Sequence, residues 1–471
     1  MASPLPLTIQ QALLPTTEGY RTVDVQIQDE RILAVGNNLQ TQGTVTIAEN
    51  KLLLPGFVNA HTHSSEMWQR GLIRPFPLEL WLAELHEFAP LSLDQVYLSA
   101  LGTAVETLLS GGTSVVDHLT LIPQQELETI EVAVKAYREA GIRAFIGPLI
   151  QDQHPDAGIP QGKEKVEIDG YFRSTAETLA ILREAVERWH RPEEGINILV
   201  APTGMQMCTD ALFQGCIELS DMFNLCRHAH LLETKAQQLL AQEKYGCTAV
   251  EHLHHLGYLS PKTSLAHCIW LTDSDIQIMA ATQTTVVHNP LSNLRLGSGI
   301  APVLKYRQAG VNVSFGCDGS ASNDSQDLLE AIKIGSILHN ITDFEYRHWI
   351  TPQESVEMAS LNGAKGLHCQ DQLGSVEVGK QADLVLYDLT NLSLLPRTDP
   401  LGLLIWGRPT HGVDSVWVRG RQVVRDGQVL SVDVAQLRKD LFAASQWQTP
   451  RHSQWVEQVE DRYRRVMGLD D

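Results

Sequence analysis

Residues 52–63 read LLLPGFVNAHTH, an apolar run that ends in two histidines one residue apart. The length and apolar character of this run predict a buried β-strand. Because side chains alternate along a strand, His61 and His63 face the same side and can hold one metal ion together. A pair of histidines that only bond to their neighbours explains the spacing equally well.

Similar strand-like runs recur through the middle of the chain. They lie near residues 53–60, 113–118, 143–150, 196–201, 224–231, 263–270, 284–288 and 311–317. Helical stretches separate most of them, for example 94–110, 124–140, 174–190, 235–256 and 325–339. Eight strands that alternate with helices predict a (β/α)8 barrel of TIM type, an α/β fold.

The two ends of the chain have a different pattern. Short strand-like stretches around tight turns occupy residues 23–27, 32–36, 383–387 and 416–424. We therefore expect residues 1–55 and 370–432 to form one small β-sandwich domain beside a barrel of residues 56–369. Residues 433–471 read as a helical segment that packs on the outside.

Composition excludes several classes of partner. The chain has 471 residues, 43% of them apolar, and a net charge of -20, which disfavours nucleic acid and anionic membranes because both need a basic face. Seven scattered cysteines without a CxxC pair favour reduced thiols in a cytoplasm over a disulfide framework. We see neither a signal-peptide pattern nor a run of roughly 18 apolar residues that could span a membrane.

The fifth predicted strand ends in two histidines and an acid. His228 and His230 share a face, and either could bind a metal ion, but His230 lies nearer the strand end and is the better candidate. His228 is then a deeper core histidine. Glu233 suits a carboxylate that takes and returns protons beside a water molecule, although an acid at the start of a helix is also stabilised by the helix dipole.

Strands six and eight end in His267 and in Asp318. A carboxylate directly after a buried strand is costly unless it is paired or bound to a metal ion. Three histidines and one carboxylate suit zinc, with iron and manganese also open, and such an ion would lower the pKa of a bound water molecule to roughly 7.

Taken in order along the chain, these motifs resemble those of the amidohydrolase superfamily, in its mononuclear branch of aromatic-ring deaminases and triazine hydrolases. The branch includes enzymes that act on methylthioadenosine, S-adenosylhomocysteine and atrazine. The matching segments are 55–63 (PGFVNAHTH), 111–113 (GGT), 230–234 (HLLET), 266–268 (AHC), 288–294 (HNPLSNL), 297–299 (GSG), 318–323 (DGSASN) and 374–385 (GSVEVGKQADLV).

The resemblance implies a role for each of these residues. His61, His63, His230 and Asp318 would bind one divalent metal ion per chain. Glu233 would carry a proton from the attacking water to a ring nitrogen and then to the leaving amine, and His267 would polarise the ring or orient the hydroxide. Strand four lacks the lysine that bridges two metals in binuclear relatives, which favours a single ion.

The expected reaction is hydrolytic deamination of a purine, pteridine, pyrimidine, triazine or cyclic guanidine. Thr203 stands where the nucleoside deaminases of this branch have a histidine, and Glu84 and Glu87 do not match their ribose-binding acid. These two differences argue against a nucleoside substrate. Relatives are often homodimers or larger, which implies a homo-oligomer.

Candidates for substrate contact come from the loops. Trp68, Gln69 and Trp81 follow strand one, and a flat ring could stack on a tryptophan. Gln206 could bind a ring edge, and His154 could reach the substrate from the loop after strand three. A packed loop explains the tryptophans equally well, and exposed side chains explain the other two. His118, after strand two, is a further candidate for the pocket wall.

Two alternative functions remain open at this stage. The same ligands would serve a triazine-type hydrolase that releases chloride or an alkylamine. A barrel that binds a heterocycle without turnover is also possible, since a fold alone does not establish activity.

Overall fold

A closed ring of parallel strands occupies the middle of the chain, in a computed structural model that describes residues 6–160, 173–445 and 454–469. In ring order the strands are β6 (Phe57–Thr62), β7 (Gly112–Thr120), β8 (Arg143–Ile150), β9 (Ile196–Ile198) with β10 (Ala201–Pro202), β11 (Arg227–Leu231), β12 (Thr263–His267), β13 (Thr285–His288) and β14 (Val313–Phe315). This ring confirms the predicted barrel.

Two junctions close the ring. Parallel bridges from Val200 to Arg227 and from Gly204 to His230 join the fourth strand position to β11. At the other junction, the backbone N–H of Asp318 donates to the carbonyl oxygen of His61 at 2.9 Å. Both junctions involve residues of the predicted metal site, so closing the barrel also assembles the site.

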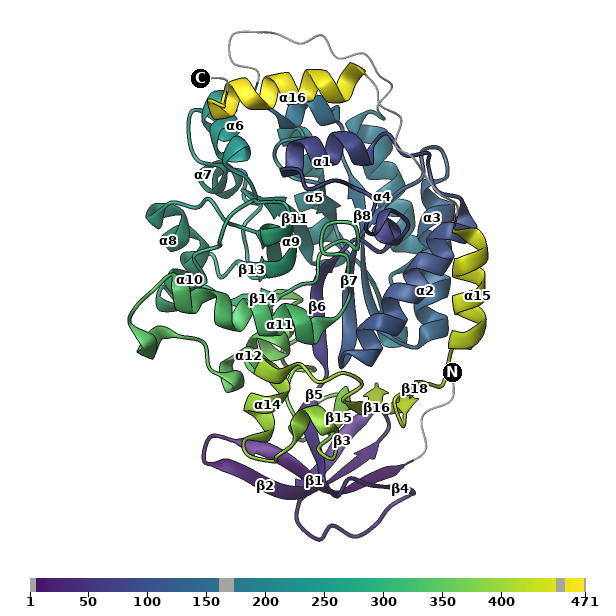
Figure 1. Ribbon diagram of the computed structural model, residues 1–471. Coiled ribbons are helices and arrows are strands. Elements are labelled where there is room, and N and C mark those ends of the chain that lie inside the picture. Colours follow the sequence, from purple (N-terminus) through teal and green to yellow (C-terminus); the bar gives the residue numbers. More distant parts are fainter. Residues whose placement is uncertain (1–5, 161–172, 446–453, 470–471) are drawn as a thin grey trace.

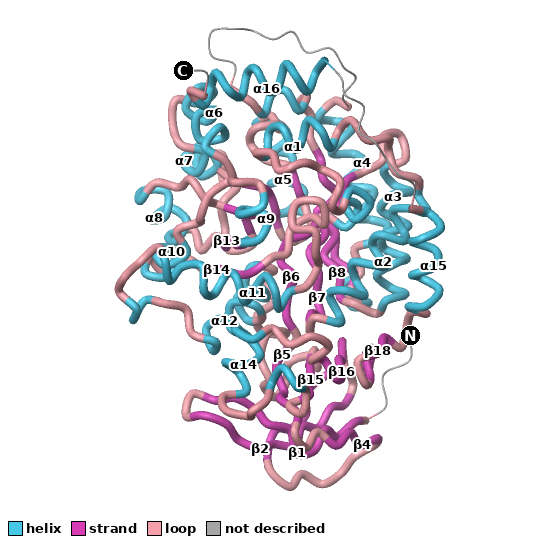
Figure 2. The backbone as a smooth tube through the Cα atoms, viewed as in Figure 1, coloured by secondary structure: helices cyan, strands magenta, loops and turns pink. Residues whose placement is uncertain are grey.

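Helices surround the strands of the ring (Figure 2). Those that follow the ring strands are α2 (Leu93–Leu109), α3 (Glu126–Ala140), α4 (Thr175–Trp189), α5 (Asp210–Phe223), α6 (Lys235–Tyr245), α7 (Ala249–His255), α8 (Asp273–Ala281), α9 (Pro290–Arg295), α10 (Val303–Gln308), α11 (Leu328–Ile337), α12 (Pro352–Ala359) and α13 (Leu361–Gly366). A large apolar core lies between these helices and the strands.

Two elements differ from the sequence prediction. The single helix expected at 235–256 is two helices, because Gly246 ends α6 in the left-handed region at φ 68° and Thr248 starts α7 with a capping box. The fourth strand is interrupted because the N–H of Leu199 bonds to Ile146 on β8, whereas that of Val200 bonds to Cys226 beside β11.

The chain ends build a second sheet beneath the barrel (Figure 1). Its strands are β1 (Leu7–Thr16), β2 (Gly19–Gln28), β3 (Arg31–Gly36), β4 (Thr44–Ile47), β5 (Lys51–Pro55), β15 (Leu384–Asp388), β16 (Val413–Val418), β17 (Arg421–Arg425) and β18 (Gln428–Val429). Hydrogen bonds link all nine into one sheet, in which β5 pairs with both β1 and β15. The predicted union of the two chain ends is therefore confirmed.

Two C-terminal helices pack outside the barrel. Helix α15 (Val434–Ala444) lies against α2, and α16 (Gln454–Met467) lies over α1 (Leu78–Leu85) at the end opposite the second sheet (Figure 1). The remaining helix, α14 (Pro400–Gly407), lies beside the second sheet. The predicted tail also covers residues 446–453 and 470–471, which lie outside the described residues. None of the described helices is both long and apolar enough to cross a membrane.

Candidate active site

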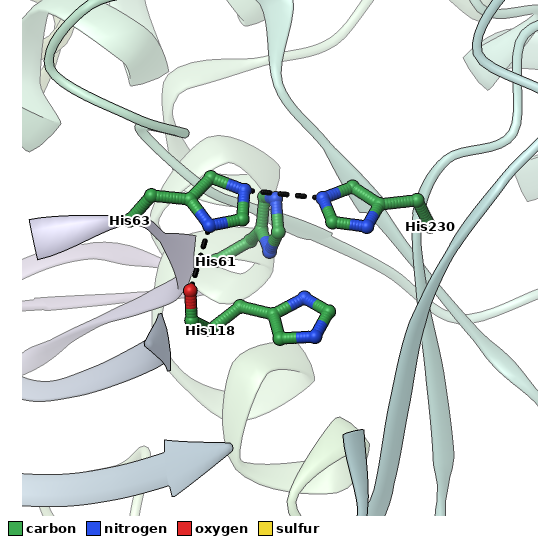
Figure 3. A group of neighbouring side chains, drawn as sticks. All are labelled: His61, His63, His118 and His230. Atoms are coloured by element: carbon green, nitrogen blue, oxygen red, sulfur yellow. Dashed lines mark hydrogen bonds between the residues drawn. The ribbon is translucent and has the colours of Figure 1, made fainter. Parts of the chain in front are cut away.

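Four side chains meet at the C-terminal ends of β6, β11 and β14. The Nε2 atoms of His63 and His230 lie 3.1 Å apart, and Oδ1 of Asp318 lies 3.3 Å from Nε2 of His61 and 3.6 Å from Nε2 of His63. Figure 3 shows the rings of His61, His63 and His230 gathered at one point. The structure thus brings together all four side chains that the sequence analysis proposed as ligands.

In each of the three histidines the other ring nitrogen, Nδ1, already has a hydrogen-bond partner. His63 Nδ1 donates to the carbonyl oxygen of His118 at 2.7 Å, and His230 Nδ1 donates to that of Thr203 at 2.7 Å. A proton on Nδ1 leaves a lone pair on Nε2, so both histidines are held in the form that binds a metal ion.

His61 is held in the same form by a chain of hydrogen bonds. Its Nδ1 lies 2.8 Å from Nε2 of His228, and Nδ1 of His228 lies 2.8 Å from Oγ of Ser264. Ser264 in turn donates to the carbonyl oxygen of Arg227. With each group donating to the next, Nε2 of His61 carries the free lone pair. His228 therefore orients His61, one of the proposed metal ligands.

These nitrogen atoms fit a divalent cation. Nε2 of His61 is buried without a hydrogen-bond partner among the described residues, and two lone pairs face each other across 3.1 Å between His63 and His230. Two nitrogen ligands of a tetrahedral zinc ion, each about 2.0–2.1 Å from it, lie roughly 3.3 Å apart. The donor set is therefore suited to a metal ion of the zinc type.

Burial favours the neutral form of three histidines at the site. It lowers the pKa of His61 to about 4, and it lowers the pKa of His118 and His230 well below the ordinary value of histidine. Burial alone would raise the pKa of Asp318, but the close contact with His61 and the nearby His267 and His63 lower it well below its ordinary value. Neutral imidazoles and a charged carboxylate are the states that bind a cation.

His118 adds a fifth member that the sequence analysis placed only in the pocket wall. Its ring stacks on that of His230 with the centroids 4.9 Å apart, and its Nε2 donates to the carbonyl oxygen of Ala201. Its buried Nδ1 has no partner among the described residues, and His118 forms a possible ligand group with His61, His63 and His230. The second such group joins His61, His267 and Asp318.

Two strand ends adopt an unusual backbone conformation here. His267 has φ 72° and Asp318 has φ 64°, values that residues other than glycine rarely adopt. Thr62 Oγ1 and Gln326 Nε2 both donate to the carbonyl oxygen of Asp318, which holds this conformation in place. Such strain is concentrated at functional sites because surrounding contacts must maintain it.

Glu233 and His267 form a second pair beside the ligands. Oε2 of Glu233 lies 3.5 Å from Nε2 of His267, and Ser298 Oγ donates to Oε1 of Glu233 at 3.1 Å. Nδ1 of His267 donates to Oδ1 of Asn293, so its Nε2 faces Glu233 and Asp318. Burial raises the pKa of Glu233 to about 7, which suits a group that both takes and returns a proton.

A cavity of about 520 Å³ opens beside the cluster. It lies among the 3-10 helix η1 (Ser64–Gln69), the loop after α1, the ends of β7 and β8, and the starts of α3 and α4. Its walls are mostly apolar, with Leu85, Phe88, Leu121, Ile122 and Ile150 among them. A space of this size can hold a substituted heterocycle.

Of the five substrate candidates, one lines this cavity. Gln69 belongs to its wall, whereas the indole N–H groups of Trp68 and Trp81 donate to the carbonyl oxygens of Gln95 and Ala321 within packed loops.

Gln206 and His154 lie on another side of the barrel mouth. Gln206 lines a cavity of only about 30 Å³ beside α16. His154 starts the 3-10 helix η2 (Pro155–Gly158), and its Nδ1 accepts from the backbone N–H of Asp156. The structure therefore does not bring these two side chains into the large cavity.

Two buried acids close to the cluster, on η1 and β7, escaped the sequence analysis. Glu66 lines the large cavity from η1, and Asp117 accepts hydrogen bonds from Ser64 N, Ser64 Oγ and Tyr137 Oη. Asp117 therefore holds the turn that follows His63. Its place inside an apolar strand was the available signal, because a carboxylate there needs partners. Glu66 gave no such signal, since it lies in a polar loop.

The chain matches known proteins along most of its length. The amidohydrolase family matches residues 52–423. A 5-methylthioadenosine/S-adenosylhomocysteine deaminase of Pyrococcus furiosus is 32% identical over 413 residues, which cover 87% of this chain and 92% of that protein.

Two solved structures share the fold. An adenosine deaminase from Xanthomonas campestris with bound zinc has a TM-score of 0.83 and 26% identity, covering 98% of this chain and 100% of that one. An atrazine chlorohydrolase from Arthrobacter aurescens with zinc has a TM-score of 0.86 and 23% identity, covering 93% and 99%. At 23% identity the second likeness concerns the fold alone.

Proposed function

The chain belongs to the amidohydrolase family, and on that premise we propose that it is a metal-dependent hydrolase that deaminates a nitrogen heterocycle. Water and an amino-substituted ring would give ammonia and a ring carbonyl. The observation that carries the proposal is the pairing of Glu233 with His267 beside the contacts that join His61, His63, His230 and Asp318. A protein that only bound a heterocycle would not need this proton-carrying pair.

We propose that His61, His63, His230 and Asp318 hold one divalent ion, most naturally zinc, with iron and manganese as alternatives. When bound, such an ion supplies a Lewis acid that makes water acidic near neutral pH. His228 and the carbonyl oxygens of His118 and Thr203 keep the three imidazoles oriented for it.

Glu233 is the proposed proton carrier. As a carboxylate it takes a proton from the attacking water, and as an acid it returns that proton to a ring nitrogen. It then takes the second proton from the hydroxyl group now on the ring carbon and gives it to the leaving amine. Ser298 holds its Oε1, which leaves Oε2 facing His267. His267, itself held by Asn293, is placed to polarise the ring or to orient the nucleophile.

The substrate class follows from this chemistry. Amino-substituted purines, pteridines, pyrimidines and triazines, and cyclic guanidines, carry the amino group on an electron-poor carbon beside a ring nitrogen that can accept a proton. The relative from Pyrococcus furiosus is named for two adenine nucleosides, so the purines come first in this series.

A release assay tests the proposal. Zinc-loaded protein is incubated with a panel of these five ring classes, and ammonia, chloride and alkylamine are measured separately. We expect ammonia from at least one ring, and a loss of about 100-fold or more in turnover for Glu233→Gln with its metal content unchanged. No product from any ring, or near-normal turnover of Glu233→Gln, would contradict the proposal.

Glu251→Gln is the matched control. Glu251 caps α7 away from the cluster, and a glutamine can replace it in the capping box. Its turnover should equal that of the unaltered protein. Removal of the metal by a chelator should abolish ammonia release, and readdition of zinc should restore it.

The organisation and setting of the enzyme are part of the same proposal. We divide the chain into a small β-sandwich domain (1–55 with 370–432), a barrel (56–369) and a C-terminal helical segment (433–471). We further infer a homo-oligomer in the cytoplasm that acts on a small heterocycle and binds neither nucleic acid nor membrane.

A further inference from the structure

Glu66 is a buried acid that the proposed reaction does not use. It lies on η1, three residues after the proposed ligand His63, and its side chain is almost completely buried. Its Oε2 accepts from the backbone N–H of Ala321 at 3.4 Å, and within the described ranges no lysine or arginine forms an ion pair with it. A buried carboxylate with one weak donor is costly, so it needs a further partner.

The chain makes room for this acid at another strand end. A Cβ atom on Gly319 would lie 1.7 Å from Oε2 of Glu66, so any other residue at this position would displace the carboxylate. Gly319 directly follows Asp318 at the end of the eighth strand. The glycine therefore seats Glu66 next to the proposed ligand set.

Glu66 also belongs to the wall of the large cavity. The one arginine in that wall, Arg173, donates to both carboxylate oxygens of Glu126. Burial lowers the pKa of the other basic side chain there, His86, which favours its neutral form. Across the described part of the cavity, Glu66 is thus an acid without a cation, facing mostly apolar walls.

We propose that Glu66 is a specificity-determining residue that accepts a hydrogen bond from a ring N–H of the substrate. The preferred substrate is then an amino-heterocycle with an amidine or guanidine edge, N–H included, whose uncharged apolar substituent fills the cavity. An anionic substituent is disfavoured because it would meet Glu66 in a mostly apolar cavity whose one arginine is already paired with Glu126.

This inference rests on the proposed function, whose substrate class it narrows. Before substrate binds, the side chain of Glu66 has only the weak hydrogen bond from the Ala321 N–H among the described residues. A ring N–H would supply a further partner. The enzyme discriminates against a ring without the N–H because Glu66 is then left without this further hydrogen-bond partner.

Matched ring pairs test the inference. The probes are isocytosine and guanine against N3-methylisocytosine and N1-methylguanine, and 6-propylisocytosine against 6-(2-carboxyethyl)isocytosine. For the zinc-loaded enzyme we expect kcat/KM to be about 100-fold higher for each N–H ring than for its methylated partner, and higher for the propyl than for the carboxyethyl ring.

Two substitutions first weaken and then remove the hydrogen-bond acceptor at position 66. In Glu66→Gln the preference for N–H rings should fall to about tenfold, and in Glu66→Met, which keeps the volume, it should fall further, mainly through KM. Glu84→Gln is the matched control, because Glu84 is also a buried acid after strand one but pairs with Arg74 outside the cavity wall. Its preference should equal that of the unaltered enzyme.

The outcomes separate the two proposals. Ammonia from none of the five ring classes contradicts the proposed function, and calorimetric binding of the same ring pairs then still tests Glu66, because it needs no turnover. The proposed role of Glu66 is overturned if the unaltered protein shows no preference for N–H rings. It is also overturned if Glu66→Met keeps that preference. Loss of bound zinc in Glu66→Gln also overturns it, since the acid would then be a metal ligand.

Discussion

The metal cluster stands on strand ends, whereas the cavity beside it is walled by loops and helices. In the cluster, Nδ1 of His61, His63 and His230 is held by a partner at 2.7–2.8 Å. The cavity has mostly apolar walls, and one of its acids, Glu66, forms no ion pair with a lysine or arginine in the described part of the chain. In the proposed function the cluster carries out the chemical step, and in the further inference the cavity selects the substrate by its shape and by one hydrogen bond to Glu66. Substitutions in the two regions should therefore have different signatures.

The largest effect should come from the cluster itself. Asp318→Asn removes the one carboxylate of the proposed ligand set, and we expect turnover to fall by about 1,000-fold or more and zinc affinity to weaken. Ammonia release, metal content and circular dichroism measure the three properties. Asp433→Asn is the control, because Asp433 caps α15 outside the barrel and asparagine also caps. Full turnover in Asp318→Asn would remove the cluster from the mechanism.

A smaller effect should follow from loosening one ligand. Ser264→Ala breaks the chain of hydrogen bonds that runs through His228 to His61, and we expect zinc affinity to fall by about 10–100-fold. Competition with a chelator measures this affinity. Ser355→Ala, at an equally buried serine on α12, should leave it unchanged. Equal affinities in both variants would show that the deeper histidine does not orient His61.

A substitution in the cavity should change substrate binding and leave the metal content unchanged. Leu121→Trp would fill part of the cavity, so we expect KM for an apolar-substituted ring to rise about tenfold while bound zinc stays constant. Steady-state kinetics with the propyl and unsubstituted rings separate the effect of the substituent. Leu392→Trp, at an exposed residue, is the control. An unchanged KM would place the substrate elsewhere.

The smallest effect concerns stability and pH. Glu79 on α1 accepts from Thr234 Oγ1, its Oε2 has no partner among the described residues, and burial raises its pKa. The folded state therefore holds this proton more tightly than the unfolded state, so Glu79 costs stability as pH rises above its ordinary range. Glu79→Gln should gain free energy of unfolding, relative to the unaltered protein, at pH 8 but not at pH 4. A gain that is independent of pH would contradict this cause.

Much of the cluster was predictable because strands have simple rules. Alternation placed His61 and His63 on one face, and the barrel pattern placed His230, His267 and Asp318 at the same mouth. The split of the predicted helix at 235–256 was less visible, although Gly246 and Thr248 carried the signals for it.

The cavity was much harder to predict. Trp68 and Trp81 have the right chemistry for stacking on a ring, yet loop packing commits their N–H groups to backbone carbonyls. Glu66 is one of many acids in the chain, and it becomes informative only because Gly319, more than 250 residues later, leaves space for it. Contacts between loops far apart in sequence have no periodic signal.

The sequence by itself therefore determined the barrel, the second sheet built from both chain ends, and the chemistry of the ligands. These depend on local periodicity and on residue types at strand ends. The tertiary structure alone decided that His228 supports His61, that His118 joins the cluster, and that Glu66 faces a cavity. Each of these depends on how side chains from distant segments pack, because distances of a few ångströms decide which nitrogen or oxygen atom is free to bind.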